Sequence, residues 1–106
     1  MYYQKNDNNY RQALAGIRYK TLVHGARTSL SEFHLAKGSI IPEHAHHHEQ
    51  TGYMISGKII FHIEDQIYET LPGNSWCIPA NVKHSVEVIE DSVVIEVFSP
   101  VREEYL

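Results

Sequence analysis

The chain has 106 residues, of which 42% are hydrophobic and 21% are charged, and its formal net charge is −4. This length predicts a single domain, and no apolar stretch approaches the roughly 20 residues that a membrane-spanning helix needs. The acidic balance disfavours a nucleic-acid partner, because such binding depends on basic patches that displace counterions from phosphates. We therefore predict a soluble protein with neither a nucleic-acid nor a membrane partner.

The sequence indicates a cytoplasmic location. The first residues lack the apolar stretch of a secretory signal, and Cys77 is the only cysteine, so no disulfide can form within the chain. Cys77 lies between Trp76 and Ile78 in a predicted strand, and we expect it to be a small buried residue and not a nucleophile.

Residues 1–16 are polar and rich in Asn, and we predict a loosely ordered lead-in there, with at most a turn of helix over 10–14. From Ile17 onward, short runs of Val, Ile, Tyr and Phe alternate with turn residues, which is typical of an all-β sandwich or barrel. One domain then covers residues 17–102, and residues 103–106 form a C-terminal tail. The predicted strands cover residues 17–23, 28–36, 39–41, 49–56, 58–64, 66–71, 75–79, 84–89 and 92–99.

The breaks between these strands contain residues that favour turns. Gly tolerates a positive φ and Pro fixes the negative φ that begins a turn, so pairs such as Ser56-Gly57 and Pro72-Gly73 predict turns between two strands. Within 58–64, Ile59, Phe61 and Ile63 share one face, and we expect that apolar face to point into the core.

His44 and His46 predict a metal site. Side chains on an extended strand repeat every second residue, so these two imidazoles point the same way and could share one ion. Gln50 keeps this parity and could add its amide oxygen, whereas Glu49 is a nearby alternative of opposite parity. A further ligand must come from another strand, and His84 is the best candidate. Imidazole nitrogens and a carbonyl oxygen suit one divalent transition metal, such as Zn, Ni, Fe, Mn or Cu.

Two segments resemble the paired motifs of the cupin superfamily. The first is Gly38-x5-His44-x-His46-x3-Gln50-x6-Gly57, and the second is Gly73-x5-Pro79-x-Asn81-x2-His84. The resemblance implies a small double-stranded β-helix, or jelly-roll barrel, with the metal in its mouth. Gln50 stands where many cupins have Glu, and Asn81 stands where the second motif usually has Gly. Asn replaces Gly best in a left-handed turn, so we expect the turn at Asn81 to be kept.

The run Glu96-Val-Phe98-Ser-Pro-Val-Arg102 resembles the ending of small KdgF-type cupins, which close with Asp-x-Phe-Ser-Pro-x-Arg. These proteins are implicated in pectin and alginate breakdown. The resemblance implies conversion of a 4,5-unsaturated monouronate from its cyclic form to the linear keto form, an isomerase or lyase-like activity on a small substrate that bears a carboxylate. Carried over by position, Glu96 replaces the Asp, while Phe98 and Arg102 match.

Glu96 is also notable without the resemblance. It interrupts the apolar run 93–98, and a buried carboxylate usually has a partner or a task. If its face lines the barrel, desolvation raises its pKa and suits it to general acid or base chemistry. The alternative is an edge-strand carboxylate that points to solvent.

Arg102 follows Pro100, where the chain must leave the strand. Its guanidinium could bind a substrate carboxylate with two hydrogen bonds. A surface salt bridge with Glu103 or Glu104 is the alternative. We expect Tyr53 and Phe98 to add an apolar wall that contacts the substrate.

We hypothesise a metal-dependent enzyme that acts on a small acidic sugar. The ion, held by His44, His46, Gln50 and His84, acts as a Lewis acid, Arg102 orients the carboxylate, and Glu96 moves the proton. The alternatives are a dioxygenase-type cupin that uses Fe, Ni or Cu, and a non-catalytic cupin that binds a small molecule. We also predict a homodimer, because an N-terminal strand added to a partner's sheet would protect an open edge.

Overall fold

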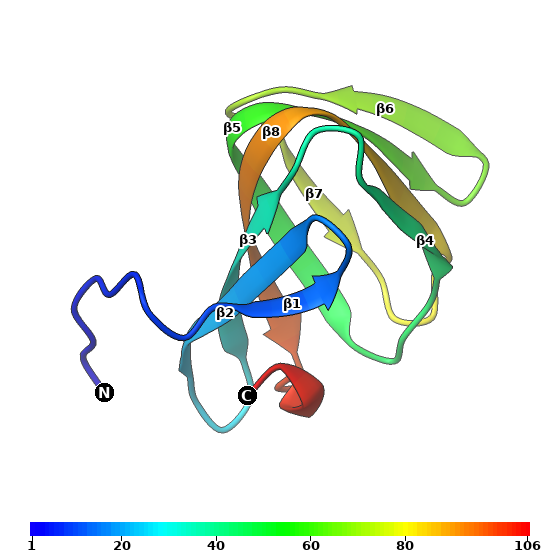
Figure 1. Ribbon diagram of the computed structural model, residues 1–106. Coiled ribbons are helices and arrows are strands. Elements are labelled where there is room, and N and C mark those ends of the chain that lie inside the picture. Colours follow the sequence, from blue (N-terminus) through cyan, green and yellow to red (C-terminus); the bar gives the residue numbers. More distant parts are fainter.

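The computed structural model describes all 106 residues. It contains eight strands and a short 3₁₀ helix at the C-terminus (Figure 1), which confirms the predicted all-β class. The elements are β1 (Arg11–Leu14), β2 (Ile17–His24), β3 (Ser29–Leu35), β4 (Ile40–His44), β5 (Glu49–Ile63), β6 (Gln66–Thr70), β7 (Ser75–Ile78), β8 (His84–Ser99) and η1 (Glu103–Tyr105). The helix η1 has neither the length nor the apolarity needed to span a bilayer.

The sheet closes because β5 and β8 are long and each pairs with different neighbours along its length. All pairings are antiparallel, in the order β1-β2-β3-β8-β5-β6, with β4 added to β8 and β7 added to β5. The first half of β5 pairs with β7 and its second half with β6, while β8 pairs first with β4 and then with β3. The sheet therefore folds over itself into a jelly-roll barrel (Figure 1).

Gly57 lies where β5 bends between the two halves of the barrel. The sequence predicts a turn at Ser56-Gly57 between two strands, but this prediction is wrong, because the register shifts through a bulge in one continuous strand. Gly57 has a φ of 91°, and a Cβ there would lie 2.3 Å from the Asp91 carbonyl oxygen. The segments 84–89 and 92–99 are likewise one strand, β8.

Two terminal segments are more ordered than the sequence predicts. Residues 11–14 form β1, which pairs with β2 across a turn at Gly16 with a φ of 77°, so neither a lead-in up to residue 16 nor a helical turn is present. The C-terminal residues also pack on the barrel. The Tyr105 ring lies 4.4 Å from that of Tyr19, and its carbonyl accepts a 2.7 Å hydrogen bond from Thr21 Oγ1.

Side chains alternate between the two faces of each strand, and those on the inner face form the core. Ile59 and Phe61 are buried and Ile63 is partly buried, as their strand pattern predicts, and towards the C-terminal end of β8 the inward positions are Val94, Glu96 and Phe98. On β7 the same alternation turns Trp76 and Ile78 inward and leaves Cys77 exposed, so the expectation of a buried Cys77 is wrong. Asn81 has a φ of 66°, which confirms the predicted left-handed turn before His84.

Candidate metal centre

His44, His46 and His84 converge at the open end of the barrel. His44 ends β4, His84 begins β8 and faces His44 in the strand register, and His46 lies in the loop between β4 and β5. Ligand atoms from the three imidazoles all lie within 4.8 Å of one another. The two-residue spacing of His44 and His46 and the separate strand of His84 are the features from which the sequence predicts this meeting.

The backbone fixes the same tautomer in all three rings. The Nδ1 atom of His44 lies 2.8 Å from the carbonyl oxygen of Pro42. The Nδ1 atom of His46 lies 3.0 Å from the carbonyl oxygen of His48, and that of His84 lies 2.9 Å from the carbonyl oxygen of Val82. Because a carbonyl only accepts, each Nδ1 carries the proton and each Nε2 keeps a free lone pair. Such a second contact is what orients metal-binding imidazoles in proteins.

Gln50 adds an oxygen to this set. It lies near the start of β5, is buried, and donates a hydrogen bond from Nε2 to Oε2 of Glu96. With its nitrogen engaged, its Oε1 is buried and has no hydrogen-bond partner. Glu49, the alternative of opposite parity, is exposed and faces Cys77, with 3.7 Å between Oε1 and Sγ.

A divalent transition metal fits these residues. His46 Nε2, His84 Nε2 and Gln50 Oε1 are buried without partners, and buried polar atoms without partners are rare in native folds. Burial lowers the pKa of His84 to about 4 and also lowers the pKa of His46, so both rings are neutral near pH 7. Neutral imidazole is the form that binds a metal, and imidazole with an amide oxygen is a donor set of borderline softness.

Glu96 lies beside this cluster and is 6% exposed, which excludes the alternative of a solvent-facing carboxylate. Burial raises its pKa to about 8. Hydrogen bonds from Trp76 Nε1, at 3.2 Å, and from Gln50 Nε2 oppose this shift, as does the charge of Arg102. Desolvation is the larger effect, because a carboxylate loses most of its hydration inside an apolar barrel.

Arg102 joins the cavity from the C-terminal segment. Its guanidinium carbon lies 4.9 Å from the centre of the Phe98 ring and 4.1 Å from that of Tyr105. Its Nε donates a 2.7 Å hydrogen bond to Glu104, so the salt bridge considered from the sequence is formed. The guanidinium nevertheless borders the cavity, and its two terminal nitrogens make no hydrogen bond within the chain.

The cavity itself has a volume of about 60 Å³. Its polar lining consists of His44, Gln50, His84, Glu96 and Arg102, with Phe98 on its apolar side. Tyr53 does not line it, and the sequence prediction for this residue is wrong. Tyr53 has opposite parity to Gln50 on β5 and is 45% exposed on the outer face of the sheet.

Comparison with known proteins agrees with this geometry. The family model described as Cupin domain matches residues 31–99, more than half of the chain. The chain belongs to the cupin family. This cupin is 28% identical over 109 residues to the pectin degradation protein KdgF of Dickeya dadantii, covering 99% of this chain and 97% of that protein.

Solved structures extend the comparison. The structure of KdgF from Halomonas sp. superposes with a TM-score of 0.93 at 25% identity over 100% of both chains. An RmlC-like cupin from Shewanella frigidimarina has a TM-score of 0.89 at 23% identity, covering 94% of this chain and 90% of that one, and supports the fold alone. The protein is thus a small single-domain cupin that resembles the KdgF type.

Two residues of this cupin's site were not identified as such from the sequence. Trp76 and Tyr105 line the cavity, but strand parity does not show how far an indole reaches, and Tyr105 lies in an apparent tail. His48, next to the predicted ligands, is 4% exposed, and its ring centre lies 6.3 Å from that of Phe98. Its carbonyl is the acceptor that orients His46, which strand parity could not show.

Proposed function

We propose that this cupin is a metal-dependent enzyme that converts a cyclic 4,5-unsaturated monouronate into its linear keto form. The observation that carries the proposal is the position of Glu96. A buried acid with a pKa of about 8 shares one small cavity with the unpaired ligand atoms of Gln50 and His84, with His44 and with Arg102. The similarity to two KdgF proteins supplies the class of substrate.

His44, His46, His84 and Gln50 would hold one divalent ion, which would polarise a substrate oxygen as a Lewis acid and lower the pKa of Glu96. The Nδ1 contacts with backbone carbonyls keep the three rings in place before the ion binds. This preorganisation reduces the side-chain entropy lost on binding.

Glu96 is suited to the proton transfers of this isomerisation. The bond between C1 and the ring oxygen breaks, the anomeric hydroxyl loses a proton, and C4 gains one as the enol becomes a ketone. No oxidant or reductant is needed. A group with a pKa near the working pH can both accept and donate a proton, and Glu96 is the buried carboxyl of the cavity.

Arg102 and Phe98 would position the substrate. The free terminal nitrogens of Arg102 can donate two parallel hydrogen bonds to the uronate carboxylate. The Phe98 ring, 1% exposed and in contact with the guanidinium, limits the orientation of Arg102 and gives the cavity an apolar side.

The test is direct. Metal-loaded protein is mixed with unsaturated galacturonate monomer, and loss of the ultraviolet absorbance of the ring double bond is followed alongside a buffer control. The proposal predicts faster loss with protein, and faster loss with metal-loaded than with chelator-treated protein. Equal rates in protein and buffer would refute it.

A homodimer and a cytoplasmic location are also proposed. β1 pairs only with β2 and leaves an open sheet edge, and Tyr53 and Ile55 expose apolar surface on the outer face of β5. A second copy of the chain could cover both features. Light scattering coupled to gel filtration distinguishes a dimer from a monomer.

The free, exposed Cys77 suits a reducing compartment.

A further inference from the structure

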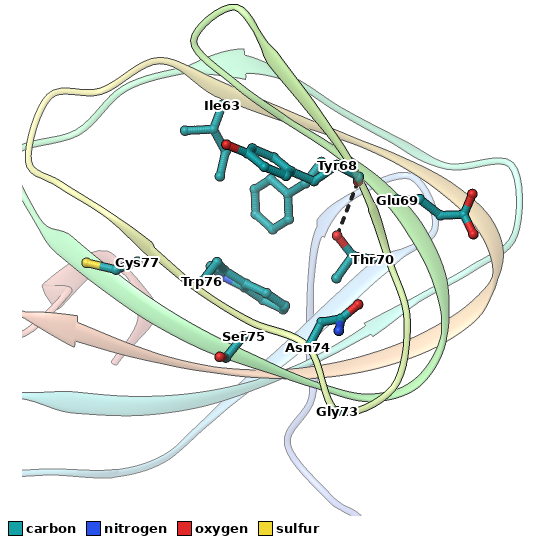
Figure 2. A pocket seen from close by; sticks show the side chains of 10 residues that line it. Ile63, Tyr68, Glu69, Thr70, Gly73, Asn74, Ser75, Trp76 and Cys77 are labelled. Atoms are coloured by element: carbon teal, nitrogen blue, oxygen red, sulfur yellow. Dashed lines mark hydrogen bonds between the residues drawn. The ribbon is translucent and has the colours of Figure 1, made fainter.

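Trp76 lies between two spaces. On one side it borders the metal cavity, and on the other it lines a groove of about 550 Å³ between β6 and β7. In Figure 2 its indole extends into the floor of this groove, while the neighbouring Ser75 and Cys77 side chains point away. The Phe61 ring, with its centre 5.1 Å from that of the indole, packs against it. Trp76 is the only tryptophan of the chain.

Gly52 explains how Trp76 reaches the cavity. Trp76 on β7 is paired with Gly52 on β5, and Gly52 is paired with Glu96 on β8, so the three residues form a row across three strands. A Cβ at Gly52 would lie 2.3 Å from Cε2 and from Nε1 of the indole. The missing side chain therefore leaves the space in which the indole crosses β5. The backbone of Gly52 is not left-handed, so its conformation does not require glycine.

Both carboxyl oxygens of Glu96 therefore accept a hydrogen bond. Trp76 Nε1 donates to Oε1 of Glu96 at 3.2 Å, and Gln50 Nε2 donates to Oε2. Gln50 alone would leave the carboxyl free to turn about its last bond. A second donor on the other oxygen fixes the plane of the group, and catalytic groups lose rate steeply when they are displaced by about 1 Å.

We infer that Trp76 is a positioning residue for Glu96, and that Gly52 is kept small so that the indole can reach it. Trp76 touches no reacting atom in this scheme and acts only through the carboxyl. The kinetic consequence rests on the proposed function, whereas the contact between Trp76 and Glu96 can be measured without a substrate.

The kinetic experiment removes one hydrogen-bond donor and changes the shape of the ring system little. Because the chain has a single tryptophan, biosynthetic incorporation of benzothienylalanine replaces the indole N–H with sulfur at Trp76 alone. Incorporation of 5-fluorotryptophan keeps the N–H and is the matched control. We expect kcat to fall about tenfold with benzothienylalanine while KM and metal content stay within about twofold, and the control to resemble the wild type. An unchanged kcat would overturn the inference.

The spectroscopic experiment needs no activity. The protein gives one indole N–H resonance, and its chemical shift and solvent exchange are compared in the wild type, Glu96→Ala and the exposed-site control Glu90→Ala. We expect a shift and faster exchange in Glu96→Ala but not in Glu90→Ala, and a similar change in Gly52→Ala, in which all cavity side chains are retained. A resonance that is unchanged in Glu96→Ala would overturn the contact. Wild-type protein inactive on the uronate would instead refute the proposed function, and the resonance would still decide the contact.

Discussion

The bend and the mouth of the barrel are both built from β5 and β8, and both bury polar side chains. At the bend, Ser92 is 3% exposed, and its hydroxyl lies 3.0 Å from the Lys58 nitrogen and 2.7 Å from the Glu90 carbonyl oxygen. These partners satisfy the hydroxyl within the chain. Ser92 therefore serves to hold the two bent strands together.

At the mouth, buried polar atoms lack hydrogen-bond partners. Four buried side-chain atoms have no partner in the chain: His46 Nε2, His84 Nε2, Gln50 Oε1 and Nδ1 of the neighbouring His48. By contrast, His62 lies on the outer face, where its Nε2 contacts Glu87 at 2.7 Å, as expected of a satisfied strand histidine. The presence of a histidine or serine therefore does not indicate a ligand, whereas several unpaired buried ligand atoms close to one another do.

The largest effect should come from Glu96 at the mouth. Glu96→Gln removes the ionisable proton and keeps the shape, so kcat for uronate ring opening should fall by about 10²- to 10⁴-fold. Metal content should not change. Glu90→Gln, an exposed change near the bend on the same strand, is the control, and equal losses in both variants would show that Glu96 has no special role.

The next effect concerns the metal ligands. His84→Ala should weaken binding of a divalent transition metal at least about 100-fold, measured by calorimetry, because one imidazole of the set is lost. His62→Ala, on the outer face, should bind the metal as the wild type does. Similar weakening in both variants would mean that binding does not depend on the mouth.

The bend should respond in stability and not in metal binding. Gly57→Ala adds a Cβ that would lie 2.3 Å from the Asp91 carbonyl oxygen, at a φ of 91° that disfavours a side chain. We expect the free energy of unfolding to drop by about 2 kcal/mol in chemical denaturation. Gly25→Ala, where a Cβ would meet nothing, should lose much less. A loss of metal affinity in Gly57→Ala would contradict the expectation that the bend affects stability and not metal binding.

The mouth should also make the metal-free protein sensitive to acid. Burial lowers the pKa of His84 to about 4 in the folded state, so folding favours the neutral ring. The corresponding stability is present above about pH 6.5 and is lost as the pH falls through about 4. Denaturation in chelator between pH 7.5 and 4 should show this loss, and His84→Asn should lose less. An equal decline in both proteins would place the acid sensitivity elsewhere.

The smallest effect is expected at Arg102. Arg102→Lys keeps the charge but cannot donate two parallel hydrogen bonds, so KM for the uronate should rise about tenfold with a smaller change in kcat. Arg18→Lys, on β2, should leave both constants unchanged. A KM equal to that of the wild type would mean that Arg102 serves only its salt bridge with Glu104.

Most of the site follows from strand parity and the two cupin motifs. The motifs bring His44, His46, Gln50 and His84 together, and parity on β5 separates Gln50 from Glu49, because side chains alternate on a strand. The same rule fails where no strand defines it. It gives no information on His48 in the loop, and it was not applied to Tyr53, whose odd position puts it outside.

The remaining features depend on long-range geometry. The continuity of β5 through Gly57 reflects a bulge that only the partner strand reveals, and the contact of Trp76 with Glu96 depends on three strands lying side by side. Tyr105 looks like part of a tail because its packing partners, such as Tyr19, are distant in sequence. No local pattern encodes such contacts.

The central claim is that the mouth binds one divalent ion through three imidazoles and an amide oxygen. Protein stripped with chelator and then titrated with Zn²⁺, Ni²⁺ or Mn²⁺ in a calorimeter tests this claim most directly. The account predicts one equivalent per chain for at least one of these ions, with release of few protons at pH 7.5, because the rings of His46 and His84 are already neutral. Binding of none of these ions, or undiminished binding after His44 and His84 are both replaced by Ala, would contradict it.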